Sequence, residues 1–187
     1  MVNKYKINNL VGIGGMCKVY RATDEKLDRY VALKILNEEL AKDNRERERF
    51  LREAKNCANL HHKNIVSVFD TGIFNDNPFI AMEFVEGTNL EKLLEKKQPL
   101  PQLLDIIKEI TKALEFAHEK GVIHRDLKPA NILISKDEIV KVADWGLSKT
   151  SKDKANLTRT GMVLGTPQYM APEQIISNDC SPQSDPS

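Results

Sequence analysis

Several polar residues whose types suit phosphoryl chemistry lie close together in the second half of the chain. Asp126, Lys128 and Asn131 fall within six consecutive positions, and Asp144 follows shortly after them. A carboxylate can orient a hydroxyl group and take its proton, and a lysine can neutralise a phosphoryl group in transfer. An amide oxygen and a second carboxylate are hard ligands of the kind that Mg²⁺ prefers. Because positioning and charge stabilisation supply most of the catalysis of phosphoryl transfer, these residue types together indicate that reaction.

The same residues belong to a longer pattern. The stretch HRDLKPANILI begins at His124 and is followed by the triplet DWG. It resembles the catalytic loop and metal-binding triplet of protein kinases, specifically the eukaryotic-like Ser/Thr kinases of bacteria. The resemblance implies that Asp126 is the catalytic base and that Lys128 contacts the γ-phosphate. It also implies that Asn131 and Asp144 bind Mg²⁺ and that His124 is a packed structural residue.

A glycine-rich turn near the N-terminus supplies a second candidate element. Gly12 and Gly14 precede Val19 in the stretch VGIGGMCKV, which begins at Val11. Glycines let a backbone approach phosphate oxygens, and exposed N–H groups bind anions. In the kinase pattern G-x-G-x-x-G-x-V the third glycine is replaced here by Cys17, and we expect a working loop with altered flexibility. Taken alone, a hairpin turn without any ligand is about as well supported.

A lysine and a glutamate complete the expected phosphate site. Lys34 ends the β-rich run VALK. A lysine on a strand is usually exposed to solvent, but the resemblance implies that Lys34 holds the α and β phosphates and pairs with a helix glutamate. Glu53 is the matching glutamate. It could be one more exposed charge in a highly charged helix, yet its spacing from Phe50 and Cys57 puts it on the apolar face, where an unpaired carboxylate is costly.

An adenine site is also implied by the resemblance. Met82 takes the gatekeeper position, and backbone groups from Glu83 to Val85 are offered to the base. The apolar residues assigned to nucleotide binding are Val11, Val19, Ala32 and Leu133. All of these could be ordinary core residues instead. Three of them, Val19, Ala32 and Leu133, would sandwich the adenine ring. For these three, a role in the core and a role in adenine binding are compatible, because the bound ring would pack as part of the core.

Trp145 departs from the family pattern, which usually has phenylalanine at this position. The resemblance implies that its ring stacks in a column with Cys57, Val68 and His124. Tryptophan is larger than phenylalanine, and its indole N–H needs a hydrogen-bond partner when it is buried. We therefore expect Trp145 and the small Cys57 to be a compensating pair.

Regulation by phosphorylation is suggested by Arg125, since kinases with an arginine here dock a phosphate carried by the activation loop. Thr158 and Thr160 offer hydroxyl groups where bacterial relatives autophosphorylate, and we expect them to be regulatory phosphosites. Threonines are also common in any solvated loop, which is the alternative. The following stretch GTPQYMAPE resembles the substrate-docking segment, so we expect protein substrates. Autophosphorylation would in turn use a dimer.

Composition argues against several other classes of function. The chain has 187 residues, 28 of them basic and 27 acidic, and its net charge of +1 gives no general attraction to nucleic acid or anionic membranes. No apolar run approaches the ~20 residues of a membrane span, and the N-terminus lacks the apolar core of a signal peptide. The widely spaced Cys17, Cys57 and Cys180 favour a reducing compartment over a disulfide framework. We therefore expect a cytoplasmic protein.

Residue periodicity predicts the elements that position these residues. Strands are expected at 19–22, 30–35, 65–70, 79–84, 132–134 and 140–142, and helices at 44–60 and 102–119. The second helix has apolar residues at helical spacing, namely Leu103, Ile107, Ile110, Leu114 and Ala117. Thr88 with Glu91 three residues later resembles a capping box at a helix N-terminus. The polar stretch 147–168 lacks periodicity and is expected to be a mobile loop.

These elements predict an α+β chain with the bilobal fold of protein kinases. We expect a complete β-rich small lobe over 1–84 and a helical large lobe over 85–187 that is truncated after the A-P-E sequence. Loss of the later helices predicts a loose large lobe and weak catalysis. The leading function is an ATP-dependent serine/threonine protein kinase that uses ATP and Mg²⁺. The alternatives are an ATP-binding or interaction fragment with little or no catalysis, and a small-molecule phosphotransferase, against which Lys128 argues.

Overall fold

The computed structural model describes residues 4–145, apart from the side chain of Glu53. The described residues form two compact units. One comprises residues 4–61 and 66–84, and the other comprises residues 62–65 and 85–145. The predicted phosphosites Thr158 and Thr160, and the stretch GTPQYMAPE, lie outside the described residues.

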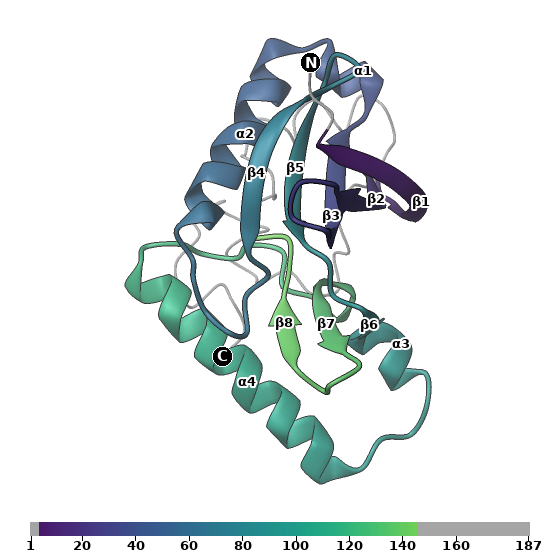
Figure 1. The fold of residues 1–187 in the computed structure, drawn as a ribbon. Coiled ribbons are helices and arrows are strands. Elements are labelled where there is room, and N and C mark those ends of the chain that lie inside the picture. The colour runs from purple at the N-terminus through teal and green to yellow at the C-terminus, as the bar shows by residue number, and fades with distance from the viewer. Residues whose placement is uncertain (1–3, 146–187) are drawn as a thin grey trace. The chain divides into compact units, whose positions relative to one another are not determined.

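The first unit is built on an antiparallel sheet of five strands in the order β1-β2-β3-β5-β4 (Figure 1). The strands are β1 (Tyr5–Ile13), β2 (Cys17–Asp24), β3 (Arg29–Leu36), β4 (Val68–Phe74) and β5 (Asn77–Glu83). Two helices follow β3, namely α1 (Glu38–Ala41) and α2 (Asn44–Ala58). The Asp43 side chain accepts a hydrogen bond from the Arg45 N–H and so caps the start of α2.

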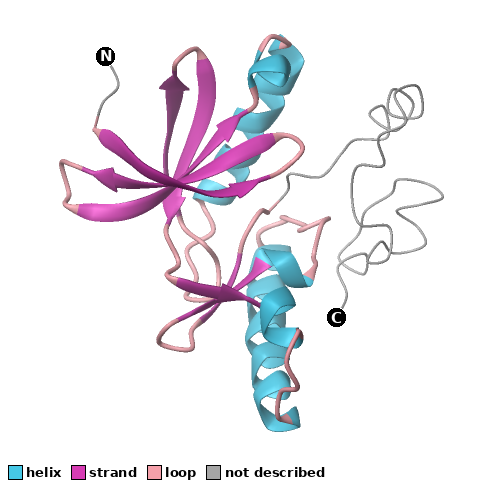
Figure 2. Ribbon diagram, turned by 90° about the vertical axis from the view of Figure 1, so that its right-hand side faces the viewer, coloured by secondary structure: helices cyan, strands magenta, loops and turns pink. Residues whose placement is uncertain are grey.

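Both faces of this sheet bury apolar residues, because successive side chains on a strand point to opposite sides. One face holds a cluster of Tyr5, Ala22, Val31, Leu33, Ile35, Phe79 and Ala81. The opposite face packs against the helices and holds Cys17, Leu36, Ala41, Phe50, Ala54 and Ile80. Figure 2 shows α2 running along the strongly twisted sheet.

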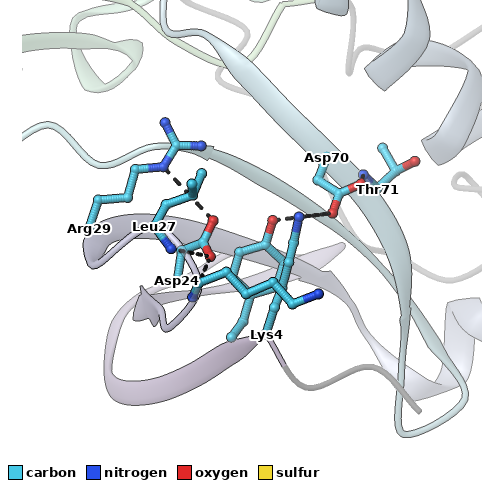
Figure 3. A network of polar contacts seen from close by, with 8 residues as sticks. Lys4, Asp24, Leu27, Arg29, Asp70 and Thr71 are labelled. Carbon is cyan, nitrogen blue, oxygen red and sulfur yellow. Dashed lines mark hydrogen bonds and ion pairs between the residues drawn. The ribbon is translucent and has the colours of Figure 1, made fainter.

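The two edge strands of the sheet, β1 and β4, are joined by side chains. Lys4 Nζ lies 2.8 Å from Asp70 Oδ2 (Figure 3), and the Tyr5 hydroxyl donates to the same oxygen at 3.2 Å. The sheet is therefore curled enough for the side chains of Lys4 and Tyr5 to reach Asp70 on the opposite edge strand, as a strong strand twist allows. Burial alone would raise the pKa of Asp70, but the hydrogen bond and charge of Lys4 bring that pKa below its ordinary value.

A buried aspartate organises the turn between β2 and β3. Asp24 Oδ1 accepts hydrogen bonds from the N–H groups of Lys26, at 3.2 Å, and Leu27, at 3.4 Å (Figure 3). Arg29 Nε lies 3.9 Å from the other carboxylate oxygen. This arrangement of an aspartate side chain over the backbone that follows it is a common way to close a turn.

The second unit combines helices with a small antiparallel sheet in the order β6-β7-β8. Its strands are β6 (Gly87–Asn89), β7 (Ile132–Ser135) and β8 (Val140–Val142), and its helices are α3 (Leu90–Leu94), α4 (Leu100–Glu119) and the 3₁₀ turn η1 (Pro129–Asn131). The helix α4 contacts β8 (Figure 1) and buries Ile106, Ala113, Leu114 and Ala117.

Four residues between α2 and β4 also belong to the second unit. The Asn64 side chain donates to the Val140 carbonyl at 2.7 Å, and the Asn64 carbonyl accepts from the Val142 N–H at 2.8 Å. Lys63 Nζ lies 2.7 Å from a carboxylate oxygen of Glu109 on α4. The chain thus leaves the first unit after α2, pairs with β8, and returns to form β4.

The predicted elements are largely confirmed, with three corrections. The strand expected at 65–70 runs over Val68–Phe74 instead, because the preceding residues pair with the second unit. The capping box at Thr88 is wrong, since the Asn89 side chain accepts from the Lys92 N–H at 2.9 Å and caps α3. Ile107 has helical spacing but is 55% exposed, because the buried stripe of α4 runs beside it.

Candidate active site

The loop between α4 and β7 brings three of the predicted residues into contact. Lys128 Nζ lies 2.8 Å from Asp126 Oδ2. Asn131 Nδ2 donates to the Asp126 backbone carbonyl at 2.8 Å and to Asp126 Oδ2 at 3.2 Å. Because the amide nitrogen of Asn131 faces Asp126, its amide oxygen is directed away from Asp126. The loop therefore presents one carboxylate, one ammonium group and one amide oxygen within a single short segment.

A fully buried histidine holds the backbone of this loop. His124 is 0% exposed, and its Nδ1 accepts a hydrogen bond from the Asp126 N–H at 3.3 Å. Its Nε2 lies 2.9 Å from the Ala143 carbonyl. Because Nδ1 is the acceptor, Nε2 must carry the proton that this carbonyl receives. His124 thus links Asp126, the candidate base, to Ala143, the residue that precedes Asp144.

Two residues of the site have backbone conformations that residues other than glycine rarely adopt. Arg125 has a φ of 68° and Asp144 a φ of 62°. Such conformations cost free energy and persist where surrounding contacts impose them, often at functional sites. One imposing contact is the hydrogen bond from the Ala143 N–H to the Asn131 carbonyl, at 2.9 Å. That bond brings the chain leading into Asp144 against Asn131.

Trp145 is 3% exposed and fills the space next to His124. The two ring centroids are 4.8 Å apart. The indole Nε1 donates to the Val142 carbonyl at 3.0 Å, so the buried N–H has the partner that its type requires. The other members of the expected column, Cys57 and Val68, belong to the first unit, and their stacking with Trp145 stays a prediction.

The first unit places the predicted phosphate-binding lysine on a defined face of its sheet. Lys34 is only 7% exposed, so the alternative of a solvent-exposed strand lysine is wrong. It pairs with Val19 on one side and Ile80 on the other, and Ala32 pairs with Met82. Cross-strand partners share a face, and Ile80 packs on the helix side. The candidate nucleotide residues of the sheet therefore lie on the face that α1 and α2 cover.

Glu53, the predicted partner of Lys34, lies in α2. Its side chain is outside the described part of the chain, so the pairing stays a prediction. The neighbours that placed it on the apolar face of the helix are buried, since Phe50 is 2% exposed and Cys57 is 7% exposed. The apolar face that the sequence predicted for α2 is thus confirmed.

The glycine-rich turn joins β1 to β2 as a hairpin. The Gly14 N–H donates to the Cys17 carbonyl at 2.8 Å, which extends the pairing to the turn itself. Gly12 has no positive φ, and a Cβ atom added there would meet nothing within 4 Å. Neither backbone conformation nor internal packing of the described residues therefore explains glycine at position 12. The Cys17 side chain, at the position of the third family glycine, is buried in the core.

The residues expected around adenine come from both units. The Glu83 N–H donates to the Ser67 carbonyl at 2.9 Å, within the first unit. Val85 belongs to the second unit, as does Leu133, which lies in β7 opposite Asn89 and Lys141. Val11 is exposed on β1.

Two further features of the described residues bear on the chemistry. They contain no group of three or more His, Cys, Asp and Glu side chains arranged for a metal ion. The magnesium ligands that the resemblance predicts are one amide, from Asn131, and one carboxylate, from Asp144, a set that would leave most of the coordination shell to water and phosphate oxygens. Within residues 4–145 no helix is long and apolar enough to cross a membrane.

Sequence reasoning missed Asn37, which contacts the glycine-rich turn. The Asn37 side chain donates to the Gly15 carbonyl at 3.0 Å, and its N–H donates to the Met16 carbonyl at 2.9 Å. An asparagine directly after a strand is a common way to begin a helix. No local pattern in the sequence signals the contact of Asn37 with Gly15, which lies 22 residues earlier in the chain.

Known proteins resemble this chain over almost all of its length. The model of the protein kinase domain family matches residues 5–186. The serine/threonine-protein kinase PknB of Mycobacterium leprae is 41% identical over 98% of the chain, and pkn3 of Myxococcus xanthus is 43% identical over 97%. The crystal structure of the Mycobacterium tuberculosis PknI kinase domain superposes with a TM-score of 0.77 at 28% identity, covering 98% of this chain and 70% of that one.

The similarity covers only part of the relatives. The chain spans 30% of the length of the Mycobacterium leprae protein and 35% of the Myxococcus xanthus protein. The shared part includes the loop with Asp126, Lys128 and Asn131, the strand lysine Lys34 and the glycine-rich hairpin, because the family match begins at residue 5 and ends at residue 186. With its kinase-like α+β fold, the chain belongs to the protein kinase domain family.

Proposed function

We propose that this chain is the catalytic segment of an ATP-dependent serine/threonine protein kinase. It would transfer the γ-phosphoryl group of Mg²⁺-ATP to serine or threonine hydroxyl groups of proteins. The observation that carries the proposal is the mutual contact of Asp126, Lys128 and Asn131 in one loop. Support also comes from the relatives, which are named serine/threonine-protein kinases.

Asp126 is proposed as the base that orients the substrate hydroxyl and accepts its proton. Among the described residues, the contacts of its carboxylate with Lys128 and Asn131 both fall on Oδ2. We assign the other oxygen, Oδ1, to the incoming hydroxyl. Lys128 is close enough to the same carboxylate for its ammonium group to face the γ-phosphoryl group as that group approaches the hydroxyl, and to lower the cost of the developing charge.

The donor set fits Mg²⁺. Asn131 has its amide nitrogen committed to Asp126, so its oxygen is the group that remains for a cation. Asp144 follows the backbone contact between Ala143 and Asn131 and supplies a carboxylate. Both are hard oxygen ligands. Asn131 and Asp144 would hold the ion, which would supply positive charge against the charge of the phosphates.

The first unit is proposed to hold the phosphates of the nucleotide. Lys34 would contact the α and β phosphates and pair with Glu53. The glycine-rich turn from Val11 through Gly14 would cover the phosphates, and the missing side chain of Gly12 supports this role because open space alone does not require glycine there.

For adenine, we propose that backbone groups of Glu83 and Val85 hydrogen-bond the ring beside the gatekeeper Met82. The apolar residues Val19, Ala32 and Leu133 would then sandwich it. Burial of Ala32 and partial burial of Val19 and Leu133 are compatible with this role.

Regulation and partners complete the proposal. Thr158 and Thr160 would accept phosphate, and the phosphate would pair with Arg125. Transfer between two copies of the chain would require at least a transient dimer. Protein substrates and a cytoplasmic location follow from the same reaction, since it needs a protein hydroxyl and a supply of Mg²⁺-ATP.

The test is a pair of measurements on the wild type and on the variant Lys34→Ala. Titration with Mg²⁺-ATP should raise the unfolding temperature of the wild type much more than that of the variant. Labelled γ-phosphate should appear on peptides with Ser or Thr acceptors and not on the matched Tyr peptide. Equal thermal responses of the two proteins, with no phosphate on any peptide, would refute the proposal.

A further inference from the structure

The glycine-rich turn is held at its second half by a residue from outside the hairpin. Asn37 directly follows β3, and its side-chain Nδ2 donates to the Gly15 carbonyl at 3.0 Å. The Asn37 backbone N–H donates to the Met16 carbonyl at 2.9 Å. One asparagine therefore binds the carbonyl groups of both residues at the tip of the turn.

These two hydrogen bonds set the direction of the N–H groups in the turn. A peptide unit is planar and trans, so its N–H points opposite to its C=O. Because the Gly15 carbonyl points toward Asn37, the Met16 N–H points away from Asn37. N–H groups turned outward from a tight turn form an anion-binding surface. The contact thus fixes which side of the turn can receive an anion.

The rest of the turn is fixed from the core side. The Cys17 side chain is buried, and Met16 packs against the same cluster, which includes Leu36 and Phe50. From α2, the guanidinium of Arg49 also lies 3.6 Å from the Met16 sulfur. By contrast, a Cβ atom on Gly12 would meet nothing within 4 Å. The second half of the turn is therefore anchored, while the first half is open.

The role of Asn37 is not that of a helix cap. Asn37 precedes α1, yet its side chain makes no capping hydrogen bond to that helix. Its amide is committed to the Gly15 carbonyl instead. Replacing the side chain therefore removes the hydrogen bond to Gly15, keeps the backbone bond to Met16, and removes no capping bond of α1.

We propose that Asn37 is a positioning residue that presets the glycine-rich turn for the phosphates of the nucleotide. This inference rests on the proposed ATP-binding function. It predicts that loss of the Asn37 amide weakens binding of ligands that carry phosphates and leaves binding of adenosine unchanged. A residue that merely stabilises the fold would change the two affinities alike.

The experiment compares the dissociation constants of Mg²⁺-ATP and adenosine for the wild type, Asn37→Ala and a matched control. Asn8→Ala is the control. The Asn8 side chain, in β1, accepts a hydrogen bond from Thr23 in β2, at the end of the hairpin away from the turn. We expect Asn37→Ala to bind ATP about fivefold more weakly, the size of effect that loss of one hydrogen bond gives, with adenosine within about twofold. Asn8→Ala should change neither affinity by more than about twofold.

A second variant keeps the inference testable if Asn37→Ala does not fold. Asn37→Asp has the same size and suits a helix start, but it cannot donate to the Gly15 carbonyl. At about 0.5 M salt, where the added charge is largely screened, it should also lose ATP affinity selectively. Equal loss of both ligands, or no loss, would overturn the role of Asn37. If the wild type binds neither ligand, the proposed function itself fails, which is a separate result.

Discussion

The proposed catalytic loop of the second unit, residues 124–131, and the glycine-rich hairpin of the first unit are held in different ways. In the catalytic loop, side chains bind one another and the backbone, as His124, Asp126 and Asn131 do. Arg125 and Asp144 even hold left-handed backbone conformations there. The hairpin has no such conformation at Gly12 or Gly14, and the second half of its turn is held by Asn37 and by packing of Met16 and Cys17 on the core.

The difference matches what each region has to do in the proposed reaction. Groups that move a proton must be held within about 0.5 Å and 10–20° of productive geometry, and that demands many supporting contacts. A turn that admits and releases a nucleotide must be able to move, and a few contacts at one end allow this. Substitutions in the catalytic loop should therefore have large effects on transfer and stability, while those in the hairpin should have modest effects on binding.

The largest effect is expected from Asp126→Asn. This change keeps the size of the side chain but removes the base, so the rate of phosphoryl transfer should fall by about 10² to 10⁴. Mg²⁺-ATP affinity should stay within about threefold, because the nucleotide is assigned to other residues. The rate is measured with labelled ATP and a Ser peptide.

Asp137→Asn is the control for this change, since Asp137 is exposed near the turn between β7 and β8. It should leave the rate unaltered. A transfer rate of Asp126→Asn close to that of the wild type would remove Asp126 from the role of base.

The next effect tests whether the catalytic loop depends on its buried histidine. His124→Ala removes the partners of the Asp126 N–H and the Ala143 carbonyl and leaves a cavity, so it should lower the free energy of unfolding by about 2–5 kcal/mol. Urea denaturation followed by circular dichroism gives the value. The exposed His61, replaced by alanine, should change it by less than about 0.5 kcal/mol. Similar losses for the two variants would mean that the loop is not held through His124.

Trp145→Phe isolates one hydrogen bond of the same region. The indole N–H bonded to the Val142 carbonyl is lost, and the smaller ring fills less space, so the free energy of unfolding should fall by about 1–2 kcal/mol. The chain has one tryptophan, so unfolding of the variant is followed by circular dichroism. The exposed Tyr30, changed to phenylalanine, provides the control. A variant as stable as the wild type would show that the bond contributes nothing.

The smallest effect concerns an ion-pair cluster that ties residues 62–65 to α4. Hydrogen bonds from Lys112 and Lys63 lower the pKa of Glu109 to about 2, from an ordinary value of 4.5. A lowered pKa means that the contribution to stability is present above pH 4.5 and disappears as the pH falls toward 2. Glu109→Gln should therefore cost a few tenths of a kcal/mol to about 1 kcal/mol at neutral pH and almost nothing near pH 2.

Denaturation of both proteins over this pH range measures the effect. Glu115→Gln on the same helix is the control, since Glu115 is exposed. A difference between wild type and Glu109→Gln that does not shrink on acidification would contradict the assignment of this pKa.

Much of the fold could be predicted because local patterns agreed with it. The β-rich run at 30–35 predicted a strand, and the helical spacing of Phe50, Ala54 and Cys57 required one buried helix face. The structure has the strand, buried from Val31 to Leu36, and buries that face of the helix. The close spacing of Asp126, Lys128 and Asn131 predicted that they share one loop, and their side chains are in contact there, while their catalytic roles stay a prediction. Burial of Lys34 could be expected only from its place after the glycine turn, since the usual position of lysine on a strand is exposed.

Other features depend on contacts that no local pattern records. Thr88 and Asn89 are adjacent and both are suitable caps, so the choice between them depends on where β6 ends. Asn64 forms a hydrogen bond with Val140, which is far away in the sequence. Because of this contact, β4 begins at Val68, three residues after the predicted start. The helix α4 carries more apolar residues than its buried stripe can hold, so some of them are exposed. Periodicity alone therefore did not identify Ile107 as exposed.

The excursion of residues 62–65 into the second unit has a consequence for folding during synthesis on the ribosome. Every strand of the first sheet has been translated once Glu83 is made. Asn64 and Ile65 can form their native contacts only later, when Val140 and Val142 have been translated. Both waiting side chains are almost fully buried in the finished protein. Until then they remain exposed on the nascent chain, in a segment flanked by folded structure on both sides. During this interval we expect a chaperone to bind, or a protease to cleave, the nascent polypeptide at this segment.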